Sequence, residues 1–418
     1  MAQERRPPLG HDPLVINPKY LRAFLSVARA GSVIRASEDL RRAQSAITRS
    51  IKELEGALDV PLFERRAHGM LLTEFGRTLM ERVEAAFGAM DLAREQFRAQ
   101  IRSTGSQGRW NDHAPVFSLA LGRQRLSVFV DLVAQRHMGA VAERFGISQP
   151  AVSQVLREVE QGIGIPLVSR TPTGIAPNAL GLALSTQLRR ALAELRKAEA
   201  EVVSLKSGVS GRVVVGTLSL GRNRLLPRAI IALTDTYPNL RVSTVEGTFE
   251  HLATLLRAGD IDFLLGGLRA PDNMVGLTSE VVVEDMLAII VRRGHPLALG
   301  GALGYRDIAR ARWILPPRGT STRVALEAAL AERNIAAPDV VVETADIAIT
   351  RGLLIGSDLV TGASPHLFQH EIDAGELEVL PLALPASRRG IGIVQRADSK
   401  PSLAARLLMD GIRQVHGL

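Results

Sequence analysis

Two stretches of the sequence carry hydroxyl, amide and cationic side chains along one side of a predicted helix. Residues 43–55 (AQSAITRSIKELE) and 148–160 (SQPAVSQVLREVE) lie 105 positions apart, and both place small or apolar residues at helical spacing. The remaining face presents groups that read base edges and phosphates in duplex DNA. The candidate DNA contacts are Gln44, Ser45, Thr48, Arg49 and Lys52 in the first stretch and Ser148, Gln149, Pro150, Ser153, Gln154 and Arg157 in the second. A solvated amphipathic helix is the plainer interpretation of one stretch, but two copies with the same flanks favour DNA.

The flanks of both stretches predict a small head built around this groove helix. Shorter helices are expected before it, at 19–30 and 36–40 in the first copy and at 124–135 and up to 145 in the second. After it, each copy has a run ending in a glycine turn, which predicts a wing. Arg65 and Arg66 in the first wing and Arg170 in the second would reach the DNA backbone. A plain surface hairpin explains the wing equally well.

Each copy continues into a long helix with a single apolar stripe. Thr73 and Asn178 are suitable N-caps for helices over residues 74–102 and 179–206. The stripes consist of Leu79, Val83, Ala86, Met90, Ala93 and Phe97 in the first helix and of Leu184, Leu188, Ala191, Leu195, Ala198 and Val202 in the second. A helix with one exposed apolar stripe needs a partner helix. We expect these linker helices to pair two chains.

The chain therefore divides into a tandem duplication and a different second half. The expected segments are a loose tail at 1–17, a first head at 18–76, its linker helix at 77–102, a connection at 103–120, a second head at 121–178, its linker helix at 179–207, and an effector half at 208–418.

The positive charge lies on the duplicated half. Residues 1–207 contain 29 Lys and Arg and 21 Asp and Glu, so they carry the whole net charge of +8. Residues 208–418 contain 22 basic and 22 acidic residues and are neutral. A basic half with groove helices suits a polyanion such as DNA, and a neutral half suits a small molecule or a protein. The absence of cysteine excludes disulfides, thiolate catalysis and Cys-ligated zinc. We find no secretory signal and no apolar run long enough for a membrane span, and expect a cytoplasmic protein.

The effector half alternates apolar β runs with helical segments, which predicts a parallel sheet. Helices are expected at 225–237 and 249–258. Strands are expected in GRVVVGTLSL, LRVSTVEG and IDFLLGGL and then at 286–291, 312–315, 340–344, 359–361, 377–380 and 392–395. Its length of about 210 residues fits two lobes better than one.

These features resemble the LysR-type transcriptional regulators over nearly the whole chain. The motifs that carry the resemblance are SQPAVS at 148–153, VPLFERR at 60–66, LTEFGRTL at 72–79, GRVVVG at 211–216, LLPRAI at 225–230 and RAGDIDFLLG at 257–266. The resemblance implies two all-α winged helix-turn-helix heads with linker helices, followed by a two-lobed α/β effector domain like a periplasmic binding protein. One lobe would comprise 208–286 and 385–418 and the other 287–384.

The second head is a departure from the family, whose members usually have one. The second groove helix is closer to the family pattern, with Ser148, Gln149 and Pro150. The first wing is closer, with Phe63, Arg65 and Arg66 where the second has Val168, Arg170 and Thr171. We expect the second head to be the main reader, because it joins the effector half directly. Alternatively, one head serves dimerisation or spacing.

The resemblance also implies an effector in the cleft between the lobes, beyond the carboxyl ends of the strands. Mapped onto this sequence, that selects Thr217, Ser219, Gly247, Thr248, Gly267, Arg318, Thr320, Ser321, Asp346 and Thr361. Hydroxyl donors at a helix start in PPRGTSTRVALEAAL, with arginine on either side, are typical of an anion site, so the effector would carry a carboxylate. Simple helix capping by Thr320 or Ser321 is the alternative.

Enzyme chemistry finds no support in the effector half. It has no lysine before Lys400 for a pyridoxal phosphate Schiff base, and the glycines around Ser219 miss the nucleophile-elbow spacing. His366 and His370 lack the glutamate of a zinc-protease motif. We therefore expect no catalytic residue, no metal and no cofactor.

Taken together, the sequence predicts a ligand-responsive regulator that binds double-stranded DNA and an organic acid and assembles as a homodimer or homotetramer through its linker helices and effector domains. Two heads per chain would give four groove helices per dimer and a long footprint. A solute-binding or sensor module, with one head used for dimerisation, is the rival interpretation.

Overall fold

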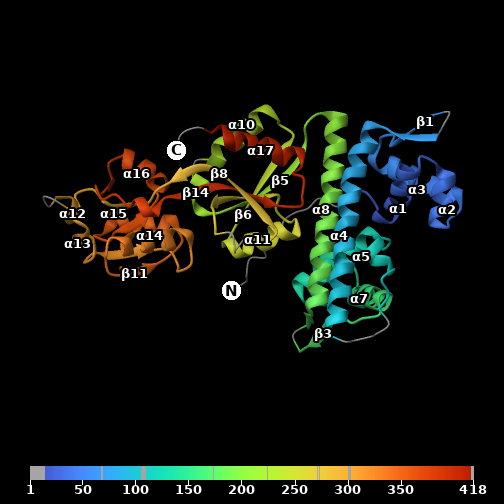
Figure 1. Cartoon of the computed structure of the whole chain (residues 1–418), viewed down its shortest axis with the longest axis horizontal. Helices are drawn as coiled ribbons and strands as arrows, with labels where there is room; N and C mark the ends of the chain where they lie inside the picture. The colour runs from blue at the N-terminus through green and yellow to red at the C-terminus, as the bar shows by residue number, and fades with distance from the viewer. Residues whose placement is uncertain are drawn as a thin grey trace. The chain divides into compact units, whose positions relative to one another are not determined.

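The structure of the chain is a computed structural model, drawn in Figure 1. It describes residues 15–66, 69–104, 110–172, 174–223, 225–270, 272, 274–299 and 303–415. The chain separates into two compact units, residues 1–212 with 257–260, and residues 213–256 with 261–418. The first unit contains both heads and both linker helices, and the second contains most of the effector half.

Each head consists of three helices and a two-stranded antiparallel wing, preceded by a turn of 3-10 helix. The first contains η1 (Pro18–Tyr20), α1 (Leu21–Ala30), α2 (Val33–Leu40), α3 (Gln44–Leu58), β1 (Phe63–Arg66) and β2 (Gly69–Leu72). The second contains η2 (Pro115–Ser118), α5 (Arg123–Gln135), α6 (Met138–Phe145), α7 (Gln149–Ile163), β3 (Val168–Thr171) and β4 (Gly174–Pro177). The groove helices α3 and α7 begin at the residues that the sequence predicts.

The duplication is repeated in individual hydrogen bonds. Glu55 Oε1 accepts from the backbone N–H of Leu62 at 2.8 Å, and Glu160 Oε1 accepts from that of Leu167 at 2.7 Å. In both heads this glutamate, on the groove helix, fixes the run that leads into the wing. Because the bond satisfies a buried backbone donor, it holds the wing and the groove helix in one register.

The linker helices start at the expected caps. Thr73 Oγ1 accepts from the N–H of Gly76 at 3.0 Å and donates to the carbonyl of Pro61 at 2.7 Å. Asn178 Oδ1 accepts from the N–H of Gly181 at 2.9 Å. The caps begin α4 (Glu74–Thr104) and α8 (Ala179–Ser207).

The two linker helices lie side by side and antiparallel (Figure 1). Arg82, near the start of α4, pairs with Glu201, near the end of α8. Lys206, at the end of α8, donates to the carbonyl of Asp59 in the first head at 3.1 Å. Phe97, near the end of α4, packs edge-on against Phe117 of the second head, with ring centroids 5.5 Å apart. Each linker helix therefore reaches the other copy's head.

The apolar stripes cover each other within one chain. All twelve stripe residues are at most 1 % exposed and belong to one core shared by both heads. We expected the stripes to join two chains. They meet inside one chain because two matching stripes on a short tether encounter each other at a high effective concentration.

Described residues of the predicted tail and connection pack against the first unit. Residues 1–14 of the tail lie outside the described residues, but Ile16 at its end is fully buried. In the connection, residues 105–109 lie outside them, whereas Trp110 packs on Phe97, with ring centroids 6.4 Å apart.

The effector half contains a five-stranded sheet in the order β6-β5-β7-β14-β8. Its strands are β5 (Gly211–Thr217), β6 (Leu240–Glu246), β7 (Phe263–Gly267), β8 (Leu277–Asp285) and β14 (Arg389–Arg396). The helices in the same part of the chain are α9 (Ser219–Asn223), α10 (Leu225–Thr236), α11 (Phe249–Ala258) and α17 (Leu403–Gln414).

Residues 288–379 form a second group of strands and helices. Its strands are β9 (Ala288–Arg292), β10 (Arg312–Leu315), β11 (Asp339–Glu343), β12 (Thr361–Ala363) and β13 (Leu377–Val379), in the orders β12-β9-β13 and β10-β11. Its helices are α12 (Pro296–Leu299), α13 (Tyr305–Ile308), α14 (Ser321–Glu332), α15 (Ile347–Gly356), η4 (Pro365–Phe368) and α16 (Gln369–Asp373), and η5 (Pro385–Ser387) leads back to β14. The effector half thus has the two-lobed organisation that the resemblance implied.

The expectation of a parallel sheet is confirmed for some strand pairs and wrong for others. β5 and β7 are parallel, as are β10 and β11, but β14 runs antiparallel to β7 and β8, and β9 runs antiparallel to β12 and β13. The strand β8 was not predicted. Between its buried ends it mixes half-buried and exposed residues, and it ends on two acidic residues, so it lacks the continuous apolar run of a buried strand. Among the helices of the described ranges, none has the length and apolar character that a membrane crossing requires.

Candidate DNA interface and effector cleft

The groove helix of the second head buries one face and exposes the other. Ser148 caps it, since its Oγ accepts from the N–H of Ala151 at 3.3 Å, and Pro150 lies in the first turn, where the missing N–H costs nothing. Val152, Leu156 and Val159 are buried beneath it. The candidate DNA contacts lie on the opposite side.

A concave surface of about 720 Å³ brings most of these candidates together. Gln149, Pro150, Ser153 and Arg157 from α7 and Arg170 from the wing all line it. Gln154 and Ser148 lie outside this lining but are exposed. Gln154 Oε1 accepts from the Arg157 guanidinium at 2.9 Å. The second head thus presents amide, hydroxyl and cationic groups around one hollow.

The first head exposes a more cationic surface. Gln44, Ser45, Arg49, Lys52 and Arg65 are exposed, and Thr48 is half-buried. Arg49 lies 3.8 Å from Glu53 one turn along α3, a distance too long for a strong pair. The side chain of Arg66, and His68 beyond it, lie outside the described residues.

The wings are positioned by backbone contacts that only glycine permits. Gly69 and Gly174 have φ values of +138° and +142°. A Cβ at these positions would lie 2.5 Å from the carbonyl oxygen of Gly31 and 2.2 Å from that of Arg136, respectively. Because both carbonyls stand at the end of the first helix of their heads, each wing is held against that helix in the same way.

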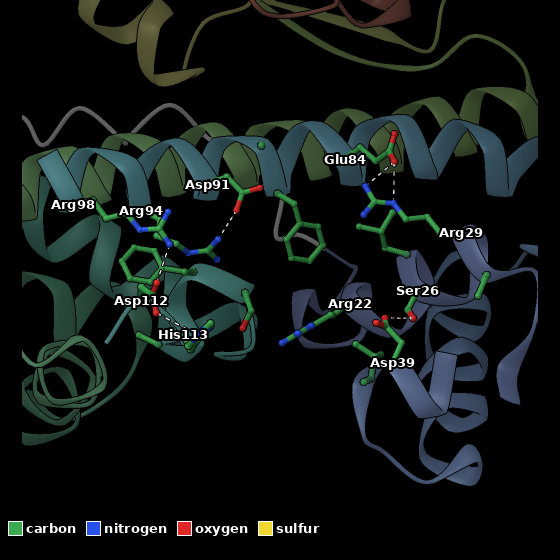
Figure 2. A pocket seen from close by; sticks show the side chains of 18 residues that line it. Arg22, Ser26, Arg29, Asp39, Glu84, Asp91, Arg94, Arg98, Asp112 and His113 are labelled. Atoms are coloured by element: carbon green, nitrogen blue, oxygen red, sulfur yellow. Dashed lines mark hydrogen bonds and ion pairs between the residues drawn. The ribbon is translucent and has the colours of Figure 1, made fainter. Parts of the chain in front are cut away.

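A hollow of about 700 Å³ separates the two heads beneath α4 (Figure 2). Its charges are mostly paired. Arg29 lies 2.9 Å from Glu84, Arg94 lies 2.7 Å from Asp91, and Arg98 lies 2.8 Å from Asp112. The arrangement neutralises the seam between the heads and does not concentrate charge of one sign. Sequence reasoning did not identify this surface, because its residues come from separate segments.

In the effector half, a cavity of about 650 Å³ lies among the strand ends. Eight of the ten predicted effector residues line it, namely Ser219, Gly247, Thr248, Gly267, Arg318, Thr320, Ser321 and Thr361. Thr320 caps α14, with its Oγ1 accepting from the N–H of Arg323 at 3.4 Å. Ser321 Oγ approaches Gly267 so closely that a Cβ there would meet it at 2.8 Å.

The other two predicted residues do not line the cavity. Thr217 is fully buried at the end of β5, and its hydroxyl is directed to the carbonyl of Val245 at 3.5 Å. Asp346 caps α15, where its Oδ1 accepts from the N–H groups of Ala348 and Ile349 at 2.8 and 3.1 Å. Both residues follow the expected rule of lying at strand ends. The side chain of Thr217 points into the core, however, and the carboxylate of Asp346 is used as the N-cap of α15.

The cavity also contains residues that sequence reasoning missed. Arg269 lies 5.3 Å above the ring of Phe249 and donates to the carbonyl of Gly319 at 3.3 Å. Burial lowers the pKa of Arg269, an effect that the charge of Glu250 partly offsets. The other missed cation, Arg222, is paired with Glu246. Arg269 lies two residues after Gly267, the last residue of β7. Including the residues that follow each strand end, and not only those at the end itself, would have identified it.

Comparison with known proteins identifies the family. The model described as "LysR substrate binding domain" matches residues 206–417, and the model described as "Bacterial regulatory helix-turn-helix protein, lysR family" matches twice, at 18–77 and 123–182. The chain belongs to the LysR family of transcriptional regulators. It is a DNA-binding regulator with an effector-binding domain. LysR-type regulators bind DNA and small-molecule effectors and form oligomers, and theirs is not an enzyme family.

Among curated LysR-type proteins, the HTH-type transcriptional regulator GalR of Pseudomonas putida is 43% identical over 399 residues, covering 96% of this chain and 97% of that protein. A match of that length includes both heads. The regulator PcaQ of Agrobacterium fabrum is 29% identical over 294 residues, which covers 70% of this chain and 94% of PcaQ.

Solved structures show the same fold. A full-length OxyR variant from Pseudomonas aeruginosa is similar with a TM-score of 0.54 and 19% identity, covering 70% of this chain and 94% of that structure. Full-length CbnR in complex with its target DNA is similar with a TM-score of 0.50 and 19% identity, covering 69% of this chain and 98% of that structure.

Proposed function

We propose that both heads of this LysR-type regulator contact DNA and that its effector is a small organic carboxylate. The observation that carries the effector proposal is the composition of the cavity at the start of α14. Ser321 offers a hydroxyl at the amino end of a twelve-residue helix, and Arg269 lines the same cavity. The hydroxyl of Thr320 caps that helix and donates to the carbonyl of Pro317. Helix N-termini and arginine both favour anions.

The rest of the cavity favours a compact apolar body on the effector. Phe249 and Phe368 are nearly fully buried and line the same space, as do Ile314 and Leu367. A cavity with an anion-binding end and an apolar wall fits an aromatic or short-chain acid. Among the described residues, Arg269 has no carboxylate within ion-pairing distance. A carboxylate on the effector would form an ion pair with Arg269 and neutralise its charge.

Thermal-shift measurements on the full chain test the effector proposal. We expect benzoate-type acids to raise the melting temperature and their neutral amides to leave it unchanged. Ser321→Ala and Arg269→Gln should each weaken acid binding about tenfold, because a hydrogen bond to a charged group contributes roughly 1.5–3 kcal/mol. Arg241→Gln is the matched control, since that arginine does not line the cavity. Equal binding of acids and amides, or insensitivity to both variants, would refute the proposal.

The DNA proposal rests on exposed cationic side chains on both groove helices. Arg49 and Arg157 lie on the solvent faces of the two groove helices. We expect Arg49→Ala and Arg157→Ala each to weaken binding to target DNA, at about 0.15 M salt, by a factor of about ten or more, since a good base contact contributes about 1–3 kcal/mol. Arg241→Ala in the effector half removes the same charge and should have no such effect. If Arg49→Ala binds like wild type, the first head serves only dimerisation or spacing.

A regulator of this family acts where its DNA is. We therefore propose that the protein works in the bacterial cytoplasm, in contact with the chromosome. Localisation of a fluorescent fusion to the nucleoid in living cells tests this placement, and exclusion from the nucleoid would contradict it.

A further inference from the structure

We propose that a buried ion cluster on α4 and α8 makes the two unlike heads of a single chain the DNA-reading pair, so that one chain recognises two half-sites of different sequence. The inference rests on the proposed function, that both heads contact DNA. It assigns to one chain the pair of heads that a single-headed regulator obtains only by joining two chains.

The cluster lies inside the interface between the two linker helices. Arg82 from α4 and Glu194 from α8 are 5 % and 4 % exposed. The Arg82 guanidinium forms a two-pronged bond with Glu201, at 2.9 Å from Nε and 2.5 Å from Nη2, and its Nη1 lies 3.1 Å from Glu194. Lys197 lies 3.2 Å from the other oxygen of Glu194. Each buried charge thus has a partner of opposite sign.

These charges are matched when α4 lies against α8, and not when α4 pairs with α4 or α8 with α8. Burial by itself lowers the pKa of Arg82, but the bond and charge of Glu201, together with Glu194, outweigh it and raise that pKa. The guanidinium is therefore stabilised as a cation only while both glutamates are opposite. Removing one partner of a buried pair leaves an uncompensated charge, which is strongly destabilising.

The 105-residue offset shows what other pairings would bring together. The position in α8 that corresponds to Arg82 is Gln187, and the positions in α4 that correspond to Glu194 and Glu201 are Ala89 and Gln96. If α4 paired with α4 of a second chain, each Arg82 would face alanine and glutamine. If α8 paired with α8, the glutamates would face glutamine. Both arrangements bury unpaired charge.

The apolar stripes do not make this distinction. Ala86 corresponds to Ala191 and Ala93 to Ala198, and the other stripe positions also hold apolar residues in both helices. On apolar contacts alone, the three pairings would be similar. The charges therefore select α4 with α8, in the way that buried polar groups specify partners in other helix pairs.

The two heads that this pairing presents differ in what they can read. Arg49 in α3 corresponds to Gln154 in α7, and Ser45 corresponds to Pro150. Arginine pairs two-fold with guanine and glutamine with adenine in the major groove. Two identical heads related by symmetry read a palindrome, whereas these two heads require half-sites that differ.

Selection of duplexes from a random library by the full chain tests the inference directly. We expect an enriched motif with two dissimilar half-sites in fixed order, about one helical turn apart. Gln154→Arg should make the second half-site resemble the first without altering the first. A palindromic motif with identical half-sites would overturn the inference while leaving DNA binding intact. Enrichment of no duplex would instead overturn the proposed function.

Charge exchange tests the role of the cluster. On the selected duplex, Arg82→Glu should weaken binding about 100-fold, because the gain from two linked heads is lost when their geometry no longer lets both engage the duplex together. Adding Glu194→Gln and Glu201→Arg in the same chain should restore binding. Mixing the Arg82→Glu chain with a Glu194→Gln, Glu201→Arg chain should not. Restoration only in the mixture would show that the helices pair between chains and would overturn the inference.

If the charge-exchange variants do not fold, replacing the charged residues of the cluster with apolar ones still tests whether the cluster selects the partner helix. The variant Arg82→Met, Glu194→Leu, Glu201→Leu removes the selective charges and retains a packed interface. We expect it to permit pairing between chains, so that the mass measured by light scattering rises above that of wild type at equal concentration. An unchanged mass with an unchanged selected motif would show that the cluster does not choose the partner.

Discussion

Glu199 on α8 is a half-buried carboxylate, and the cost of its charge should make the first unit less stable at high pH. Its Oε1 accepts from the N–H of Ile16, at the end of the tail, at 2.5 Å. Burial raises the pKa of Glu199 to about 7 from 4.5, although backbone hydrogen bonds from Ile16 and Val15 and the charges of Arg123 and Arg196 act in the opposite direction. The substitution Glu199→Gln retains the acceptor and removes the charge.

The size of the effect follows from the difference between the folded and unfolded pKa values. A rise from 4.5 to about 7, at about 1.36 kcal/mol per unit, corresponds to roughly 3 kcal/mol. The folded state binds the proton more tightly, so the stabilising contribution is complete below pH 4.5 and is lost as the pH rises through 7. Most of this change falls between about pH 5 and pH 8.

Urea unfolding of the full chain at pH 5 and pH 8 measures the effect. The chain has two tryptophans, and a Trp313→Phe background leaves Trp110, which packs on Phe97 and Phe117, as the reporter of the first unit. The free energy of unfolding of Glu199→Gln minus that of its parent should increase from pH 5 to pH 8 by about 2–3 kcal/mol. Equal differences at the two pH values would refute the reasoning, since other titrating groups cancel in the comparison.

Three further substitutions test the packing of the two units. Gly181→Ala should destabilise the first unit by about 1–3 kcal/mol, because the added Cβ would lie 2.3 Å from the carbonyl oxygen of Leu167. In Gly88→Ala, on α4, the added Cβ meets no atom within 4 Å, so this change should stabilise the first unit by up to about 1 kcal/mol. Urea midpoints followed by Trp110 check both, and two variants of equal stability would contradict the prediction. Asp285→Ala should cost the effector half about 3–5 kcal/mol, because Arg389, held at 3.0 Å, would be left buried without its partner. Unfolding followed by Trp313 measures this loss, and a loss below about 1 kcal/mol would show that Arg389 finds another partner.

Local signals located the elements of the heads accurately. The starts of α3 and α7 and the caps at Thr73 and Asn178 depend on residues within one helical turn, so a single stretch of sequence contains the whole cause. The effector half was less accessible to this reasoning. β8 is an edge strand whose partner, β14, lies about a hundred residues later, so its pairing has no local signature.

The amino-acid order by itself determined the duplication, the family, the helices and the apolar stripes, because periodicity, caps and motifs are properties of neighbouring residues. Only the tertiary structure decided that the stripes of α4 and α8 cover each other, that Arg82 meets Glu194 and Glu201, and that Arg269 joins Ser321 while Thr217 turns inward. These outcomes depend on which distant surfaces come together and on the cost of burying a charge without a partner, and no local pattern records either.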